Sequence, residues 1–293
     1  MEGRDVGPEL KQLRRRSMRT AALGLGGVAL LGLSGCSHEL QSQAARVGML
    51  APASDRAHYM SDLWIGAWIA CAVIGALVWG LIFYAMWKFR KRPGNEVPHQ
   101  TRYHVPLEVL YTVVPFLIIG VLFFYTVKAQ NGVLAKVDQP AHTINVVGQK
   151  WSWSFNYMEQ DNPEIGATVH EIGTIEKIPD LYLPVDQPVR FNLTSADVIH
   201  SFWVPAFYFK MDVIPGHPNS FDLTPTELGT FDGKCAELCG TYHAAMLFTV
   251  HVVSQEEYSA YVKGLAEQGQ TGERTGPQNP SALPSAPAKE EEK

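Results

Sequence analysis

The stretch "CAELCGTYHAAM", Cys235–Met246, contains the side chains on which the interpretation of this chain depends. Cys235 and Cys239 are four residues apart, His243 follows four residues later, and Met246 lies three residues further on. Thiolate, imidazole and thioether groups are soft or borderline ligands, which favour copper over hard cations. A blue-copper site on a β-sandwich needs one thiolate, so two thiolates in one loop predict two copper ions bridged by both sulfur atoms.

Two bridged copper ions need a second imidazole and a second weak ligand. The best candidate for the imidazole is His200 in "TSADVIHSFWVP", which follows a β-rich segment, and the weak ligand would be the backbone carbonyl of Glu237. Other interpretations stay open at this point. The cysteine spacing also fits zinc, the two thiols could form a disulfide in an exported domain, and a lone histidine is often a hydrogen-bonded core residue. The thioether and the β-rich setting favour copper.

The second half of the chain predicts a β-sandwich or a small barrel. From residue 142 onward, short segments with period-two patterning are separated by Pro, Gly and Asp turns. These segments are "HTINVVG", "WSWSFNY", "PVRFNLTS", "NSFDLTP", "GTFDGK" and "MLFTVHVV". The boundaries predicted for this domain are 130–265. The remaining residues, 266–293, are rich in Gly, Pro, Ser, Gln and Glu, a composition typical of a disordered tail.

The first half predicts a transmembrane hairpin over residues 61–129. Residues 63–87 carry no charge, and a second apolar run, 109–127, is interrupted only by Pro115 and Gly120, which predicts a second span over about 108–128. The connecting loop, 88–104, has five Lys or Arg against one Glu, so the positive-inside rule places it in the cytoplasm. Everything that follows the second span is therefore expected on the outer face.

The amino terminus reads as a bacterial lipoprotein signal peptide, residues 1–35. Five basic residues between positions 11 and 19 precede a short apolar region, 21–33, which is followed by the end of "LSGC". Small residues before a cysteine predict that Cys36 becomes the lipidated first residue of the mature protein, followed by an outer segment, 36–60. The other interpretation is a signal anchor with an incidental cysteine. Both put the chain in the bacterial cytoplasmic membrane.

Charge and cysteine count exclude some classes of protein. The net charge of −5 offers no basic surface for nucleic acid, so no nucleic-acid partner is expected. Of the four cysteines, Cys71 lies in an apolar run and Cys36 in the signal region. Only one pair is left, so a disulfide framework is not predicted.

At this point the residues match a known family closely. Residues 60–262 resemble subunit II of the haem–copper cytochrome c oxidases. The upstream histidine of that family corresponds to His200 in "DVIHSFW". Its dinuclear copper motif, C-x-E-x-C-G-x-x-H-x-x-M, is met at Cys235, Glu237, Cys239, Gly240, His243 and Met246. The resemblance implies a two-helix transmembrane hairpin followed by an all-β, cupredoxin-like Greek-key sandwich.

The resemblance also implies roles for residues outside the loop. Trp151 falls where the family accepts electrons from cytochrome c, and Glu108 falls where it has an acid at the entrance of a proton channel. Asp197 corresponds to an acid on the docking face, and the side chain of Glu237 to a ligand of magnesium shared with subunit I. Without the resemblance, Trp151 would be interpreted as an aromatic residue in the core of a strand, and Glu108 as a solvated acid at the end of a helix.

Three positions depart from the family pattern. Gln149 replaces a histidine, Ser152 replaces an aromatic residue, and Asn156 replaces an acid, which removes one docking carboxylate near Trp151. A tethered or less basic cytochrome c domain would need less electrostatic steering than a highly basic soluble one.

The implied function is that of an electron relay. The chain would accept electrons from cytochrome c at two copper ions and pass them to subunit I, whose haems and second copper site reduce oxygen to water with proton pumping. The chain lacks the cluster of membrane histidines that oxygen reduction needs. The alternatives are a membrane-tethered copper carrier, which would need labile and exposed ligands, and a quinol-oxidase subunit II, which lacks the copper ligands.

Overall fold

The computed structural model describes residues 38–91 and 100–275, and these residues divide between two compact units, 1–49 and 50–293. The first unit contains helix α2 (His38–Ala45), which falls in the predicted outer segment. The predicted signal peptide and Cys36 lie outside the described residues, so lipidation stays a prediction. Everything that follows belongs to the second unit.

Two long helices form the hairpin. Helices α3 (Ala57–Lys88) and α4 (Val105–Val133) are long and apolar enough to cross a membrane, each with a hydropathy of 2.3 over its most apolar window. Both predicted spans lie inside them. Helix α4 begins where the sequence offers a start signal, because His104 accepts a hydrogen bond from the amide of Leu107 and Pro106 occupies the first turn. Most apolar side chains on both helices are exposed, as expected of a surface that faces lipid or partner helices.

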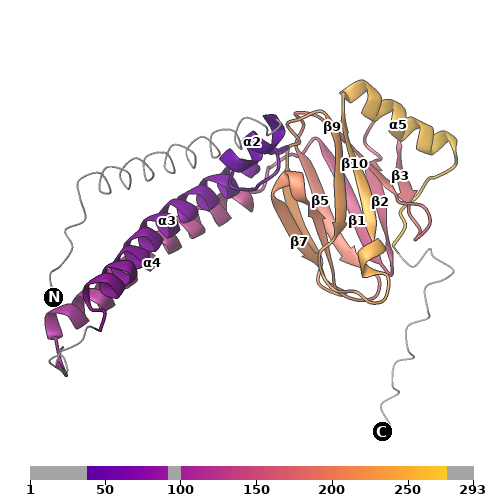
Figure 1. Ribbon diagram of the computed structural model, residues 1–293. Helices are drawn as coiled ribbons and strands as arrows, with labels where there is room; N and C mark the ends of the chain where they lie inside the picture. The colour runs from indigo at the N-terminus through magenta and orange to yellow at the C-terminus, as the bar shows by residue number, and fades with distance from the viewer. Residues whose placement is uncertain (1–37, 92–99, 276–293) are drawn as a thin grey trace, which may run out of the picture. The chain divides into compact units, whose positions relative to one another are not determined.

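Within the described residues, ten strands form two five-stranded sheets that pack as a sandwich (Figure 1). The first sheet has the order β3-β2-β1-β5-β8 and the second has the order β4-β10-β9-β6-β7. Strands β1 and β5 are parallel, as are β4 and β10, and the other pairs are antiparallel. The strand bounds are β1 His142–Gln149, β2 Ser152–Glu159, β3 Ala167–Ile172, β4 Asp180–Pro184, β5 Val189–Ser195, β6 His200–Val204, β7 Phe209–Val213, β8 Asn219–Leu223, β9 Gly229–Cys235 and β10 Leu247–Val253. The prediction of a β-sandwich after two apolar helices is confirmed.

Aromatic side chains fill the space between the sheets. On β2, the alternation of "WSWSFNY" turns Trp153, Phe155 and Tyr157 into the core, where each is fully buried. Phe202 of β6 and Phe248 of β10 stack with ring centroids 4.8 Å apart and also contact the Trp153 ring. These close-packed rings belong to the same strands whose ends carry the candidate site or lead into it.

The chain beyond the sandwich is more ordered than its composition predicts. Helix α5 (Gln255–Glu267) starts at a capping box formed by Ser254 and Glu257 and buries three apolar side chains. Residues 268–275 then run beside β3, where the amide of His170 donates to the carbonyl of Gln270 and Thr271 bridges to Val169. The prediction of disorder from residue 266 is therefore wrong for residues 266–275, because the free edge of β3 offers backbone partners that composition cannot reveal. Residues 276–293 lie outside the described part of the chain.

A buried carboxylate fixes the segment after α4 to the sandwich. Asp222 of β8 accepts two hydrogen bonds from Arg190, at 2.9 and 2.7 Å, and one from the amide of Val137 at 2.7 Å. The side chain of Asp222 is fully buried. Burial alone would raise the pKa of Asp222, but the hydrogen bonds from Arg190 and Val137 outweigh it and lower the pKa.

Candidate metal centre

Strand ends from the second sheet position the candidate ligands. His200 is the first residue of β6 and Cys235 is the last residue of β9. The two strands are neighbours, with Phe202 paired to Cys235, so the upstream histidine is brought beside the first thiol. The loop that follows β9 carries Cys239 and a short 3-10 turn, His243–Ala245, before β10 begins.

Four predicted donor groups lie around the two thiols, which makes six donors in all. The Sγ atoms of Cys235 and Cys239 lie 4.0 Å apart. The Sγ atom of Cys235 lies 3.9 Å from Nδ1 of His200 and 3.3 Å from the carbonyl oxygen of Glu237. The Sγ atom of Cys239 lies 3.5 Å from Nδ1 of His243 and 3.8 Å from Sδ of Met246. Each thiol thus has one imidazole and one weak donor beside it.

This donor set fits two bridged copper ions better than the alternatives. Both thiols are free and buried, and their Sγ separation is about twice the ~2.0 Å of a disulfide bond. A structural zinc ion takes four ligands and would leave two of the six donors unused. The thioether of Met246 is fully buried at the site, and zinc sites are built from Cys, His and carboxylate groups. His200, Cys235 and Cys239 alone place three ligand atoms within 4.8 Å of one another.

The two thiols ionise as a coupled pair. A hydrogen bond with Cys239 lowers the pKa of Cys235 to about 3, against the effect of burial. The same contact, together with burial, raises the pKa of Cys239, because the second thiol would have to ionise beside a thiolate.

A carboxylate orients His200. Oδ1 of Asp197 lies 2.8 Å from Nε2 of the imidazole, which leaves Nδ1 facing Cys235. Burial alone would lower the pKa of His200, but its contacts with Asp197 and Cys235 outweigh burial and raise the pKa. Asp197 also accepts from the amide of Lys150 at 2.7 Å, and only 20% of its side chain is exposed. The sequence predicted a docking role for this acid and missed its contact with the ligand.

Trp151 lies against the loop that carries the thiols. Its indole Nε1 donates a hydrogen bond to the carbonyl oxygen of Cys239 at 3.2 Å, and its ring meets Tyr242 edge-on with centroids 5.0 Å apart. The side chain is 8% exposed. Gly240 is required beside it, because its φ is +121° and an added Cβ would lie 3.1 Å from the indole nitrogen.

Two further aromatic residues of the site were not foreseen. Trp153 donates from Nε1 to the carbonyl oxygen of Met246, with a separation of 3.4 Å, so both tryptophans of "WSW" hold the backbone of a candidate ligand. Tyr242 is 49% exposed beside Trp151. The sequence offered one signal for a role of Trp153 at the site, the spacing of the two tryptophans in "WSW". That spacing indicates only that both side chains lie on one face of a strand.

The structure places three other predicted residues away from the thiols or on the rim. The side chain of Glu237 is exposed, and only its carbonyl approaches Cys235. Glu108 lies in the first turn of α4, where it accepts a hydrogen bond from the amide of His104. Asn156 is fully buried and pairs with Arg274 of the C-terminal segment, so the position at which the family has an acid is covered here.

Comparison with known proteins gives consistent matches. The model of the family "Cytochrome C oxidase subunit II, periplasmic domain" matches residues 142–253. A "Probable cytochrome c oxidase subunit 2" of Streptomyces avermitilis is 42% identical over 92% of this chain and 92% of that protein. The "Cytochrome c oxidase subunit 2" of Corynebacterium glutamicum is 34% identical, over 85% of each chain. Among solved structures, the periplasmic domain of subunit II of the cytochrome oxidase of Bradyrhizobium japonicum is 31% identical, with a TM-score of 0.39, and covers 45% of this chain and 99% of that one.

Proposed function

The chain belongs to the cytochrome c oxidase subunit II family, and from that premise we propose that it accepts electrons from a cytochrome c at a dinuclear copper centre. It then passes them to the oxygen-reducing subunit I of the same complex. The observation that carries the proposal is the pairing of each thiol with one imidazole and one weak donor at 3.3–3.9 Å.

Six residues would hold the two copper ions, with both sulfur atoms as bridges. They are His200, Cys235, Glu237 through its carbonyl, Cys239, His243 and Met246. When bound, two copper ions that share two thiolates supply a one-electron store delocalised over both metals. The chemistry of the donor set supports this assignment, because soft sulfur and borderline nitrogen donors are what copper prefers.

Four of the six donor residues are shielded from solvent. Cys235, Cys239, Met246 and His200 are each at most 5% exposed. The hydrogen bond of Asp197 fixes the ring of His200, as second-shell carboxylates do at other metal sites. A site that cannot rearrange suits electron transfer, since little reorganisation accompanies each change of charge.

Trp151 is the proposed contact for the donor haem protein, a soluble cytochrome c or a tethered cytochrome c domain. Its indole donates a hydrogen bond to the carbonyl oxygen of Cys239, so a donor protein that contacts the ring is one hydrogen bond away from a candidate ligand. The exposed carboxylate of Glu237 is the proposed ligand of a magnesium ion shared with subunit I, and Glu108 is the proposed entrance for protons. A lipid anchor at Cys36 would add a second attachment to the membrane.

The burial of the donors argues against the two alternatives. A copper carrier must release its metal, and a site whose two thiols are at most 5% exposed lacks the open ligands that release needs. A quinol-oxidase subunit lacks the copper donors, whereas all six are gathered here.

Copper loading of the purified full chain tests the proposal. We expect two copper ions per chain and an EPR spectrum in which one unpaired electron couples to both nuclei. Cys235→Ser should abolish that spectrum, and Met246→Leu should shift it while it keeps the packing volume. Cys71→Ser is the matched control, because Cys71 lies exposed on α3. One copper ion per chain, or a spectrum that survives Cys235→Ser, would refute the dinuclear assignment.

A further inference from the structure

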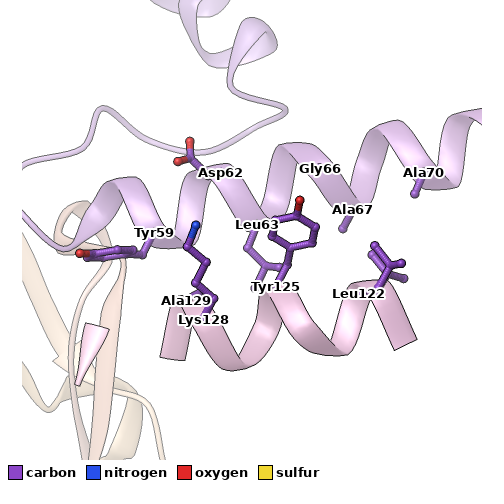
Figure 2. A pocket seen from close by; sticks show the side chains of 11 residues that line it. Tyr59, Asp62, Leu63, Gly66, Ala67, Ala70, Leu122, Tyr125, Lys128 and Ala129 are labelled. Carbon is purple, nitrogen blue, oxygen red and sulfur yellow. The ribbon is translucent and has the colours of Figure 1, made fainter. Parts of the chain in front are cut away.

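Exposed apolar side chains surround the candidate metal centre. Most others among the described residues lie on α3 and α4, which line a cavity of about 380 Å³ between them (Figure 2), and lipid or partner helices account for exposed groups on such helices. Among residues 142–275, six large apolar side chains are exposed, and four of them are next in sequence to a candidate ligand. These four are Ile199, Leu238, Tyr242 and Leu247. Exposed apolar groups gathered around one site are typical of a contact surface for another protein.

Trp151, the proposed contact for the electron donor, offers a partner little of its own surface. It is only 8% exposed. On one side Gly240 lies against the indole, where an added Cβ would be 3.1 Å from Nε1. The ring of Tyr242 meets the same indole edge-on, with the centroids 5.0 Å apart and the planes at 79°, and Tyr242 is 49% exposed. A protein that approaches Trp151 therefore covers more of Tyr242 than of Trp151 itself.

The loop fixes Tyr242 beside the candidate ligands. The amide of His243 donates to the carbonyl of Gly240 at 3.1 Å, and the amide of Ala245 donates to the carbonyl of Tyr242 at 2.9 Å. Tyr242 thus directly precedes the 3-10 turn His243–Ala245. It is one peptide bond from the candidate ligand His243, and its ring touches the indole that donates to the carbonyl of Cys239. A group that contacts this ring lies close to the candidate metal centre.

The surface around Tyr242 is poor in charge. Residues 238–250 contain no Asp, Glu, Lys or Arg. Both carboxylate oxygens of Asp197 already accept hydrogen bonds inside the domain. The residue before Trp151 is Lys150, a cation that does not attract a lysine-rich face. The surface therefore fits a partner whose contact face is apolar, and the edge of a haem macrocycle is a planar apolar group of the kind that packs against an aromatic ring.

We propose that Tyr242 is the principal contact for the donor's haem, on a cytochrome c domain whose exposed haem edge is framed by apolar side chains. The inference rests on the function proposed above and adds the chemistry of the partner's contact face. The haem edge packs on the exposed part of the Tyr242 ring, beside the small exposed part of Trp151. One electron leaves the ferrous haem, which becomes ferric, and is accepted at the proposed copper centre. Tyr242 keeps its phenolic proton and is neither oxidised nor reduced.

Stopped-flow reduction of the copper-loaded full chain by ferrocytochrome c tests this contact. The rate is measured as a function of donor concentration, at low and at high salt. Tyr242→Ala should lower the second-order rate constant about tenfold, the effect of losing one aromatic contact at the centre of an interface. The limiting rate at saturating donor should be unchanged, because the hydrogen bond from Trp151 to Cys239 remains. The loss should be equal at both salt concentrations, since salt screens charges and not apolar contacts.

Three controls separate a contact from a structural support. Tyr242→Phe keeps the aromatic ring and should behave as the wild-type chain does. Leu228→Ala removes an apolar side chain that is 64% exposed and directly precedes β9, at the opposite end of that strand from Cys235, and should leave the rate unchanged. Hexaammineruthenium(II), a small reductant that needs no protein contact, should reduce Tyr242→Ala and the wild-type chain equally fast. Both proteins should show the same copper content and the same EPR spectrum.

The outcomes distinguish this inference from the function on which it rests. A normal rate in Tyr242→Ala, together with slow reduction of Trp151→Phe, would refute the contact and leave the proposed function standing. Slow reduction of Tyr242→Ala by hexaammineruthenium(II) as well, or an altered EPR spectrum, would make Tyr242 a support for the loop and overturn the proposal. A loss that disappears at high salt would exclude an apolar partner face. A wild-type chain that ferrocytochrome c does not reduce would refute both proposals together.

Discussion

Replacement of Trp151 by Phe separates electron acceptance from copper binding. The indole donates one hydrogen bond to the carbonyl oxygen of Cys239, and Phe would leave that buried acceptor without a donor. The loss should cost about 1–3 kcal/mol of unfolding free energy. Because Trp151 is the proposed contact for the donor, truncation of this ring should cost about 1.4 kcal/mol or more in donor binding, that is, about tenfold in the rate of reduction at low donor concentration.

Trp153→Phe is the matched control for this prediction. Trp153 also donates to the carbonyl of a candidate ligand, Met246, but it is fully buried and cannot touch a donor protein. Both variants should retain two copper ions and a delocalised EPR spectrum, and both should unfold at a lower temperature. Only Trp151→Phe should slow reduction by cytochrome c in stopped-flow measurements. Equal slowing in both variants, a normal rate in Trp151→Phe, or loss of copper from Trp151→Phe would each refute the assigned role.

Three further predictions concern other parts of the chain. Asp222→Asn removes the charge that Arg190 pairs with, so the domain should lose about 2–4 kcal/mol at pH 7. The pKa of Asp222 is lowered in the folded state, so its contribution is present above the unfolded value of about 4 and is lost as pH falls through the folded pKa. The free energy of unfolding, measured with urea, should therefore fall less steeply with decreasing pH in the variant than in the wild-type chain. Parallel pH dependences of the two proteins would contradict the assignment. Glu108→Gln keeps an oxygen that can accept from the amide of His104, so α4 and the copper spectrum should persist while steady-state turnover of the assembled oxidase falls; unchanged turnover would reduce Glu108 to a helix-capping residue. Mass spectrometry of the mature subunit should find a diacylglyceryl group on Cys36 and no residues 1–35, whereas a retained Met1 would exclude processing.

The candidate ligands could be predicted because most of them are close in sequence. Five of the six lie within "CAELCGTYHAAM", so their residue types and spacing already specify the chemistry. His200 is different, since it lies 35 positions before Cys235 and reaches it only through the pairing of β6 with β9. Strand pairing of this kind depends on tertiary packing, and the period-two pattern of each strand gives no partner. The sequence offered His200 as the best candidate from its β-rich context, and the resemblance to a family supported that choice.

The C-terminal segment shows where composition fails. Residues 268–275 are polar and rich in Gly, and they bury little apolar surface of their own. They are ordered by hydrogen bonds to β3 and by the contact of Arg274 with Asn156, and these partners lie a hundred or more residues earlier in the sequence. Local composition indicates the conformational entropy that is lost when such a segment becomes ordered. It does not reveal the hydrogen bonds with distant residues that compensate for this loss.

Asp197 shows how the role predicted for a residue can differ from the contacts that the residue makes. The sequence placed an acid near the donor contact, and exposed acids near such contacts steer basic partners. In the structure, one oxygen of this carboxylate faces Nε2 of His200 and the other accepts from the amide of Lys150, the residue next to Trp151. One carboxylate therefore connects the candidate copper ligand with the backbone of the proposed donor contact. With both oxygens engaged and most of its side chain covered, Asp197 has little free charge to steer a distant partner. Its geometry favours a positioning role, in which the distance between the donor contact and the metal ligand is fixed by the same side chain.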